Sequence, residues 1–192
     1  MSRARAVLAG PLSRLAGLKL YLFSGALTLA GVALVAALAQ VQIRLPFTPV
    51  PVTGQTLGVY LLAFFLGPRL GAASMGLYLL VGALGLPVFA GGRAGLAGGP
   101  TAGYLVGMAV AVVAMGALVR LGAARGFWRT YLVCLVGSVC VFGAGLWQLS
   151  HFVPANQLLT AGLWPFVPGD VVKSVLAATT VTLANHSSQV RE

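Results

Sequence analysis

Asp170 and Lys173 are the side chains of this sequence best placed to do chemistry. They lie in the stretch PFVPGDVVKS, and Asp170 is one of only two acidic residues among 192, the other being Glu192. Three positions apart at the predicted start of a helix, they share a helical face. An ionisable side chain in an apolar segment is costly and therefore indicates a functional site. We expect the Asp170 carboxylate to accept hydrogen bonds from the N–H groups of a ligand, and Lys173 to orient it or to meet a ligand anion.

A purely structural role for the same pair is the alternative. Asp170 follows Pro168 and Gly169, where its oxygen would cap the helix N-terminus and its charge would suit the helix dipole. Lys173 would then neutralise the carboxylate or extend its ammonium group outwards. The sequence alone leaves both interpretations open.

Two unusual loops contain further candidate residues. Arg93, in FAGGRAGLAGGPTAGY, would pair with a ligand carboxylate in forked geometry or serve only as an interfacial charge. Glycines such as Gly92 would let this loop close over the ligand. Thr53 and Gln55, which follow the prolines of LPFTPVPVTGQT, would offer polar contacts to a ligand or cap the next helix. Tyr104 would line a cavity or lie at the membrane interface.

Catalysis and metal binding find little support in the sequence. Ser150 and His151 are neighbours, and adjacent residues on a helix do not face each other. Cys134 and Cys140 lie in an apolar run without a CxxC motif, so we expect two small core residues. A Walker-type GxxxxGK[ST] motif is absent from the sequence, so the sequence predicts no phosphate-binding loop of that type. We therefore expect no enzyme, no metal and no cofactor.

The composition is that of a membrane protein. The chain is 59% hydrophobic and only 7% charged, whereas soluble domains carry about 25% charged residues. Its net charge of +10 does not indicate a nucleic-acid partner, because the basic residues stand at the ends of apolar runs. The expected environment is therefore the lipid bilayer.

Apolar segments predict an all-α membrane protein, a bundle of six transmembrane helices. They cover about residues 20–41, 55–66, 71–84, 102–119, 130–152 and 169–184. The second and third are shorter than the roughly 20 residues that span a bilayer, so we expect them to be tilted, kinked or shielded. The whole chain, 1–192, reads as one integral membrane domain with a basic segment over 1–19 and a polar tail over 185–192.

The distribution of basic residues predicts the orientation of this bundle. Six spans put both termini on one side, and only Arg44 and Arg93 fall in the loops of the other side. The basic residues on the side of the termini are Arg3, Arg5, Arg14, Lys19, Arg69, Arg120, Arg125, Arg129 and Arg191. By the positive-inside rule the termini are cytoplasmic. Both unusual loops and the Asp170 end of the last span then face outwards, as an external ligand requires.

Small residues mark one further surface, on the first span. The AxxxA spacings there would let helix backbones approach closely in lipid, inside the bundle or against a partner. The residues are Ala26, Ala30, Ala33 and Ala37.

Four segments together resemble the BioY family, the biotin-specific substrate-binding (S) components of energy-coupling-factor (ECF) transporters. They are LPFTPVPVTGQTLGVYL, LGPRLGAASMGLYLLVGALGLPVFAGGRAGL, GPTAGYLVGM and FVPGDVVKSVLAA. The likeness covers about residues 44–107 and 166–178, and the stretch between matches only in hydropathy.

The resemblance implies a subunit of the prokaryotic cell membrane that captures biotin from outside. It would deliver biotin inwards with a transmembrane coupling subunit and a pair of ATPases, and the alanine face of the first helix would contact the coupling subunit. Asp170 would suit the ureido N–H groups, and Arg93 or Lys173 the carboxylate. The aromatic residues that would pack on the apolar parts of biotin are Phe47, Phe89, Tyr104 and Trp164. The alternatives are an S component for another vitamin, an intramembrane enzyme, or a structural bundle without a ligand.

Overall fold

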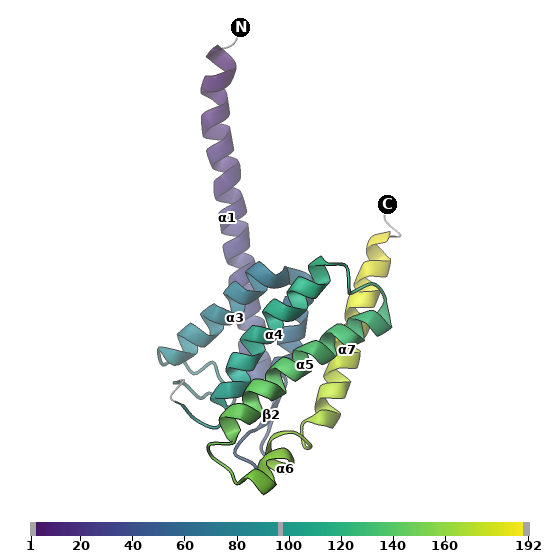
Figure 1. Ribbon diagram of the computed structural model, residues 1–192. Helices are drawn as coiled ribbons and strands as arrows, with labels where there is room; N and C mark the ends of the chain where they lie inside the picture. Colours follow the sequence, from purple (N-terminus) through teal and green to yellow (C-terminus); the bar gives the residue numbers. More distant parts are fainter. Residues whose placement is uncertain (1–2, 96–97, 190–192) are drawn as a thin grey trace.

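The computed structural model describes residues 3–95 and 98–189, and it is almost entirely helical (Figure 1). Its longer helices are α1 (Arg3–Gln40), α3 (Gly67–Ala83), α4 (Ala102–Arg120), α5 (Phe127–Leu149) and α7 (Val167–Gln189). The shorter elements are β1 (Gln42–Ile43), β2 (Val52–Thr53), α2 (Gln55–Leu61), the π-helical turn η1 (Leu62–Leu66), the 3₁₀ turn η2 (Ala155–Gln157) and α6 (Leu158–Gly162).

Five stretches of these described residues are long and apolar enough to cross a membrane. They are Lys19–Gln40, Gln55–Ala83, Ala102–Arg120, Phe127–Leu149 and Ala155–Ser187. The second and third predicted spans together form the stretch Gln55–Ala83, which changes direction at Gly67. Gly67 has φ 70°, a conformation that favours glycine, and Pro68 follows as an early residue of α3.

The Pro-rich segment contains a short hairpin that the sequence did not predict. Strands β1 and β2 are antiparallel, and Gln42 pairs with Thr53 and Ile43 with Val52. The residues between them are biased towards extended backbone by Pro46, Pro49 and Pro51, which explains why this segment is not helical. The segment between α5 and α7 contains η2 and α6, and α7 begins at Val167, two residues before the predicted start.

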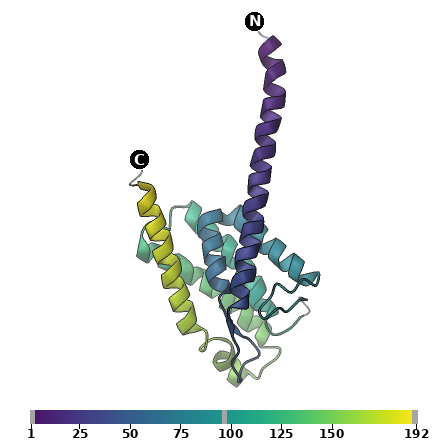
Figure 2. The ribbon, with the colours of Figure 1, turned by 180° about the vertical axis from the view of Figure 1, so that it is seen from behind.

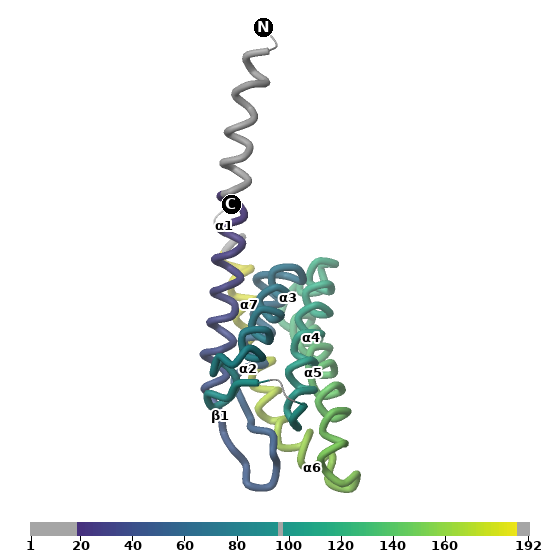
Figure 3. The backbone as a smooth tube through the Cα atoms, turned by 90° about the vertical axis from the view of Figure 1, so that its left-hand side faces the viewer, coloured from purple at the N-terminus to yellow at the C-terminus, as the bar shows by residue number. Residues whose placement is uncertain are grey.

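Glycines allow α4 and α5 to lie in close contact. A β-carbon added at Gly107 would lie 2.7 Å from the carbonyl oxygen of Cys140, and one added at Gly103 would overlap the backbone of Ala144. Gly103 and Gly107 are four residues apart, so they form one small-residue face, as in many membrane helix pairs. Figure 3 shows these two helices side by side.

Helix α1 has two different faces. Gly31, Val35 and Ala39 are buried against the bundle, and a β-carbon at Gly31 would lie only 2.6 Å from Oγ of Ser74 on α3. The predicted small-residue face is exposed at each of its four positions, Ala26, Ala30, Ala33 and Ala37. The option that these alanines pack inside the bundle is therefore wrong.

The β-hairpin and α6 lie at one end of the molecule (Figures 1 and 2). The start of α1 and the end of α7 lie at the opposite end, as both ribbon views show (Figures 1 and 2). The predicted basic segment, from Arg3 onwards, is helical and forms the first part of α1. Of the predicted polar tail, Val190, Arg191 and Glu192 fall outside the described residues.

Candidate functional site

The carboxylate of Asp170 is buried where three helices meet. Asp170 is 6% exposed, in the first turn of α7. The hydroxyl of Tyr60, on α2, donates to its Oδ1 at 2.8 Å, and the hydroxyl of Ser138, on α5, donates to its Oδ2 at 2.5 Å. Hydrogen bonds to an ionised acceptor are the strong ones, so this pair fixes the carboxylate in one orientation.

This geometry corrects the capping interpretation of Asp170. Its backbone N–H already donates to the carbonyl of Phe166 at 2.8 Å, and its side chain bonds other helices instead of the N–H groups of its own. Sequence reasoning missed Tyr60 and Ser138. The available signal was weak, because a tyrosine or a serine in an apolar span usually needs no function.

Lys173 ties α7 to the β-hairpin. Its ammonium nitrogen donates to the carbonyl oxygen of Thr53 at 3.0 Å. The side chain is half-buried and lines the same cavity as Asp170, so it does not extend outwards to the membrane surface. Among the described residues no ion pair within 4 Å joins Lys173 to Asp170. The alternative of a simple neutralising pair is therefore not what the structure contains.

Gln55 and Thr53 form a polar chain beside these residues. The hydroxyl of Thr53 donates to Oε1 of Gln55 at 3.0 Å, and Nε2 of Gln55 donates to the hydroxyl of Tyr78 at 2.7 Å. Tyr78 in turn donates to the carbonyl of Val88 at 3.1 Å. The backbone N–H of Gln55 also lies 3.4 Å from the Thr53 hydroxyl, a long contact at the start of α2. Gln55 is only 3% exposed, and both the oxygen and the nitrogen of its amide are hydrogen-bonded within the protein.

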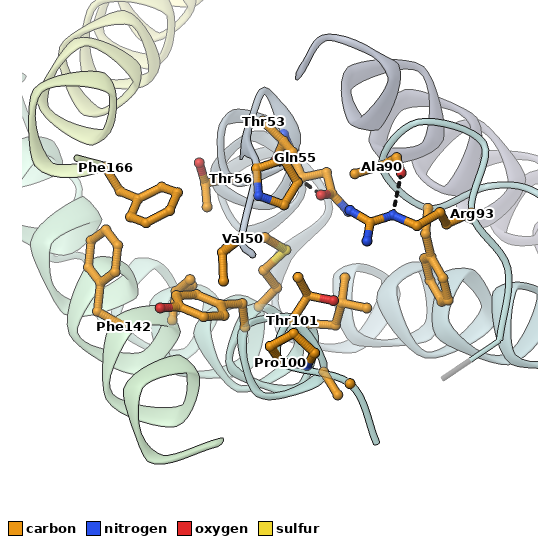
Figure 4. A pocket seen from close by; sticks show the side chains of 18 of the residues that line it. Val50, Thr53, Gln55, Thr56, Ala90, Arg93, Pro100, Thr101, Phe142 and Phe166 are labelled. Atoms are coloured by element: carbon orange, nitrogen blue, oxygen red, sulfur yellow. Dashed lines mark hydrogen bonds between the residues drawn. The ribbon is translucent and has the colours of Figure 1, made fainter. Parts of the chain in front are cut away.

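Arg93 lies in a tight turn of the Gly-rich loop. Phe89 N–H donates to the Arg93 carbonyl at 3.0 Å, and Gly92 N–H donates to the Phe89 carbonyl at 3.0 Å. Gly91 and Gly92 have φ near 70°, which a residue with a side chain rarely adopts. Nε of Arg93 donates to the Ala90 carbonyl at 3.2 Å, and the guanidinium extends towards Gln55 (Figure 4).

These residues surround one cavity of about 290 Å³. This volume lies at the lower end of the range of small-molecule sites, about 300–1,000 Å³. Of the eight predicted ligand contacts, seven line it: Thr53, Gln55, Phe89, Arg93, Tyr104, Asp170 and Lys173. The eighth, Gly92, does not; its role is in the turn. Two of the predicted aromatic residues, Phe47 and Trp164, are exposed and lie outside the lining.

The remaining wall of the cavity is apolar. Tyr104 presents its ring there while its hydroxyl donates to the Gly162 carbonyl at 2.7 Å, and its ring lies 6.2 Å from that of Phe166. The other apolar lining residues, several of them drawn in Figure 4, include Val50, Leu105, Met108, Val141 and Phe142. An apolar wall with one acid and two cations suits a small amphiphilic molecule that has both N–H groups and an anionic end.

Neither a metal centre nor a Ser–His pair emerges from the described part of the chain. It holds no cluster of three or more His, Cys, Asp or Glu side chains. Ser150 donates to the Trp147 carbonyl, and the ring nitrogen of His151 contacts the same carbonyl, so the two side chains do not bond each other.

Comparisons with known proteins agree on one family. The sequence model of the BioY family matches residues 13–189. A probable biotin transporter BioY of Pyrococcus horikoshii is 41% identical over 157 residues, which cover 80% of this chain and 91% of that protein. The biotin transporter BioY of Rhizobium etli is 40% identical over 155 residues, covering 71% and 78%.

One solved structure has the same fold. It is described as the S-component for biotin from an ECF-type ABC transporter, and it superposes with a TM-score of 0.79. The two sequences are 28% identical, and the match covers 88% of this chain and 93% of the other.

Proposed function

The chain belongs to the BioY family, and from this premise we propose that it is a biotin-binding S component that works with an ECF energy-coupling module. It is a multi-pass protein of the prokaryotic cell membrane. The observation that carries the proposal is the cavity, in which a carboxylate held by Tyr60 and Ser138 lines a mostly apolar wall together with the cations Lys173 and Arg93.

The ureido ring of biotin is the part that suits the Asp170 end. It has two N–H donors and one carbonyl acceptor. Each oxygen of Asp170 accepts one protein hydroxyl and retains a lone pair, so the carboxylate can take the ureido N–H groups. The Lys173 ammonium carries three donors and uses one on Thr53, which leaves donors for the ureido carbonyl.

The carboxylate of biotin suits Arg93, on the Gly-rich loop that lines the cavity. This residue is exposed, and its bond to Ala90 uses only Nε, so the outer N–H groups of the guanidinium can meet an anion in forked geometry. The apolar thioether ring and chain would then lie along Tyr104, Phe166 and Met108. This arrangement assigns Lys173 to the ureido ring and Arg93 to the carboxylate, a choice that the sequence left open.

The orientation and the partners belong to the same proposal. We treat residues 1–192 as one membrane domain whose six spans include both halves of Gln55–Ala83, with the termini in the cytoplasm and the cavity facing outwards. The chain has no ATP-binding motif, so ATP hydrolysis would belong to partner ATPases. The exposed face of Ala26, Ala30, Ala33 and Ala37 would contact the transmembrane coupling subunit.

Isothermal titration of the purified chain with biotin tests the proposal directly. An Asp170→Ala variant is titrated beside the native chain, with other vitamins as competitors. We expect tight binding by the native chain and a loss of at least about a hundredfold in the variant, because two or more charge-assisted hydrogen bonds disappear. Tight binding by both proteins would keep biotin and remove Asp170 from the site. If the native chain is folded but does not bind biotin, the proposal that it is a biotin-binding S component is refuted.

A further inference from the structure

The last residue of α1, Gln40, holds the turn that carries Arg93. The backbone N–H of Gly92 donates to Oε1 of Gln40 at 3.1 Å. The amide nitrogen of Gln40 donates to the Phe89 carbonyl at 3.3 Å and lies 3.5 Å from that of Val88. The two ends of one side-chain amide therefore bind both arms of a turn that is 48 to 52 positions away in the sequence.

This turn places two cavity residues. Phe89 is 5% exposed and packs edge-on against Tyr78, with ring centroids 5.4 Å apart. Arg93 closes the turn through the hydrogen bond from Phe89 N–H to its own carbonyl. Any shift of the Gly92 backbone would therefore move the Arg93 guanidinium relative to the cavity. A misplacement of about 1 Å in such a group is costly for a forked ion pair.

We propose that Gln40 is a positioning residue, which sets the Arg93 guanidinium for an anionic ligand group by fixing the turn over residues 88–93 to α1. The proposal rests on the proposed function for its ligand, biotin. The simpler role is a helix cap, because Nε2 of Gln40 also donates to the Ala36 carbonyl at 3.0 Å in the last turn of α1. A cap alone would stabilise α1 but would not interact with Arg93.

A double-mutant cycle separates the two roles. Biotin affinity is measured by titration for the native chain, Gln40→Leu, Arg93→Gln and the double variant. Positioning predicts that Gln40→Leu weakens biotin binding about tenfold in the native background, the net worth of about one hydrogen bond. In the Arg93→Gln background, Gln40→Leu should weaken biotin binding by less than about threefold, because the effects of residues that act as a unit are not additive.

Gln148→Leu is the matched control. This glutamine, on α5, holds the other part of the same loop by donating to the Gly98 carbonyl at 3.1 Å, and none of its hydrogen bonds reaches the turn. Any loss of biotin affinity in Gln148→Leu should be the same in the native and the Arg93→Gln backgrounds. The positioning role would be overturned if Gln40→Leu reduced biotin affinity equally in both backgrounds, or did not reduce it at all. Gln40→Met, which keeps the length of the side chain, repeats the test if the leucine variant expresses poorly.

A measurement without ligand keeps this inference separate from the proposed function. Amide hydrogen exchange over residues 88–93 should be at least about tenfold faster in Gln40→Leu than in the native chain, because the turn loses its side-chain attachment to α1 and the Gly92 N–H keeps only the Phe89 carbonyl as its acceptor. If the native chain fails to bind biotin, the proposed function falls, while faster exchange still supports the link between Gln40 and the turn. Unchanged exchange would overturn it, whatever the ligand.

Discussion

Tyr60 and Asp170 are joined by a 2.8 Å hydrogen bond although 110 positions separate them in the sequence. The Tyr60 hydroxyl also lies 2.8 Å from that of Ser138, which bonds the other oxygen of the same carboxylate. Three helices, α2, α5 and α7, thus meet at one acid. The network gives the carboxylate a fixed direction before any ligand arrives, which reduces the cost of binding.

Tyr60→Phe removes one donor and keeps the ring. We expect biotin affinity to fall about tenfold and the free energy of unfolding to fall by about 1–2 kcal/mol, because a buried acceptor loses its partner. Titration and thermal unfolding in detergent measure the two effects. Tyr131→Phe is the control. In the described part of the chain, the ring of Tyr131 packs against the rings of Phe127 and Trp128, and this substitution keeps that ring. Equal affinities for the native chain and Tyr60→Phe would contradict a positioning role for Tyr60.

Arg93→Gln should weaken the binding of biotin but hardly that of biotin methyl ester. The forked ion pair that we assign to Arg93 needs a charged carboxylate, and its loss should cost about 10- to 100-fold. The ester lacks this charge, so native and variant chains should bind it with similar affinity. A variant that loses both ligands equally would indicate that Arg93 supports the loop and does not contact the carboxylate.

Gly82→Ala should displace Phe89 from the cavity wall. A β-carbon at Gly82 would overlap the Phe89 ring, whereas one at Gly76, on the same helix, would meet nothing within 4 Å. Overpacking of this kind costs about 1–3 kcal/mol, so we expect a lower unfolding temperature and weaker biotin binding. Gly76→Ala should leave binding unchanged and raise helix stability slightly. If the two variants behave alike, the contact between Gly82 and Phe89 does not shape the site.

Ala33→Leu should uncouple transport from binding. Ala33 is exposed on α1, away from the cavity, so titration with biotin should give native affinity. A larger side chain would hold the coupling subunit away from the helix, and ATP-driven uptake by the complete complex in vesicles should fall at least about tenfold. Ala117→Leu, an equally exposed site on α4, should transport normally. Native uptake by Ala33→Leu would place the docking surface elsewhere.

The sequence predicted the membrane class and most of the cavity because those features depend on residue type and position. Apolar runs locate helices, and a carboxylate inside one is rare enough to be noticed. Seven of the eight predicted contacts line one cavity; six of them were expected from residue type and position, and Phe89 from the family resemblance. The direction in which Asp170 points could not be predicted, because it depends on which helices pack against α7.

The hydrogen-bond partners of Asp170 and of the Gly-rich turn could not be predicted from the sequence. Ser138 and Gln40 are ordinary residues for the middle and the end of an apolar helix, and only packing brings them to Asp170 and to the Gly-rich turn. The hairpin of β1 and β2 was missed because two-residue strands carry no periodic pattern. Phe47 and Trp164 were wrongly expected in the cavity because aromatic character alone does not distinguish a wall from an outer surface.

Each segment around the cavity is attached to a helix by a side chain that bonds a main-chain carbonyl. Thr48 binds the Ala161 carbonyl at 2.6 Å, Gln40 binds that of Phe89, and Gln148 binds that of Gly98. These attachments use different residues, so each can be removed by its own substitution. The residence time of the ligand should therefore be adjustable in steps, one attachment at a time, which offers a route to variants that capture the same vitamin but release it at graded rates.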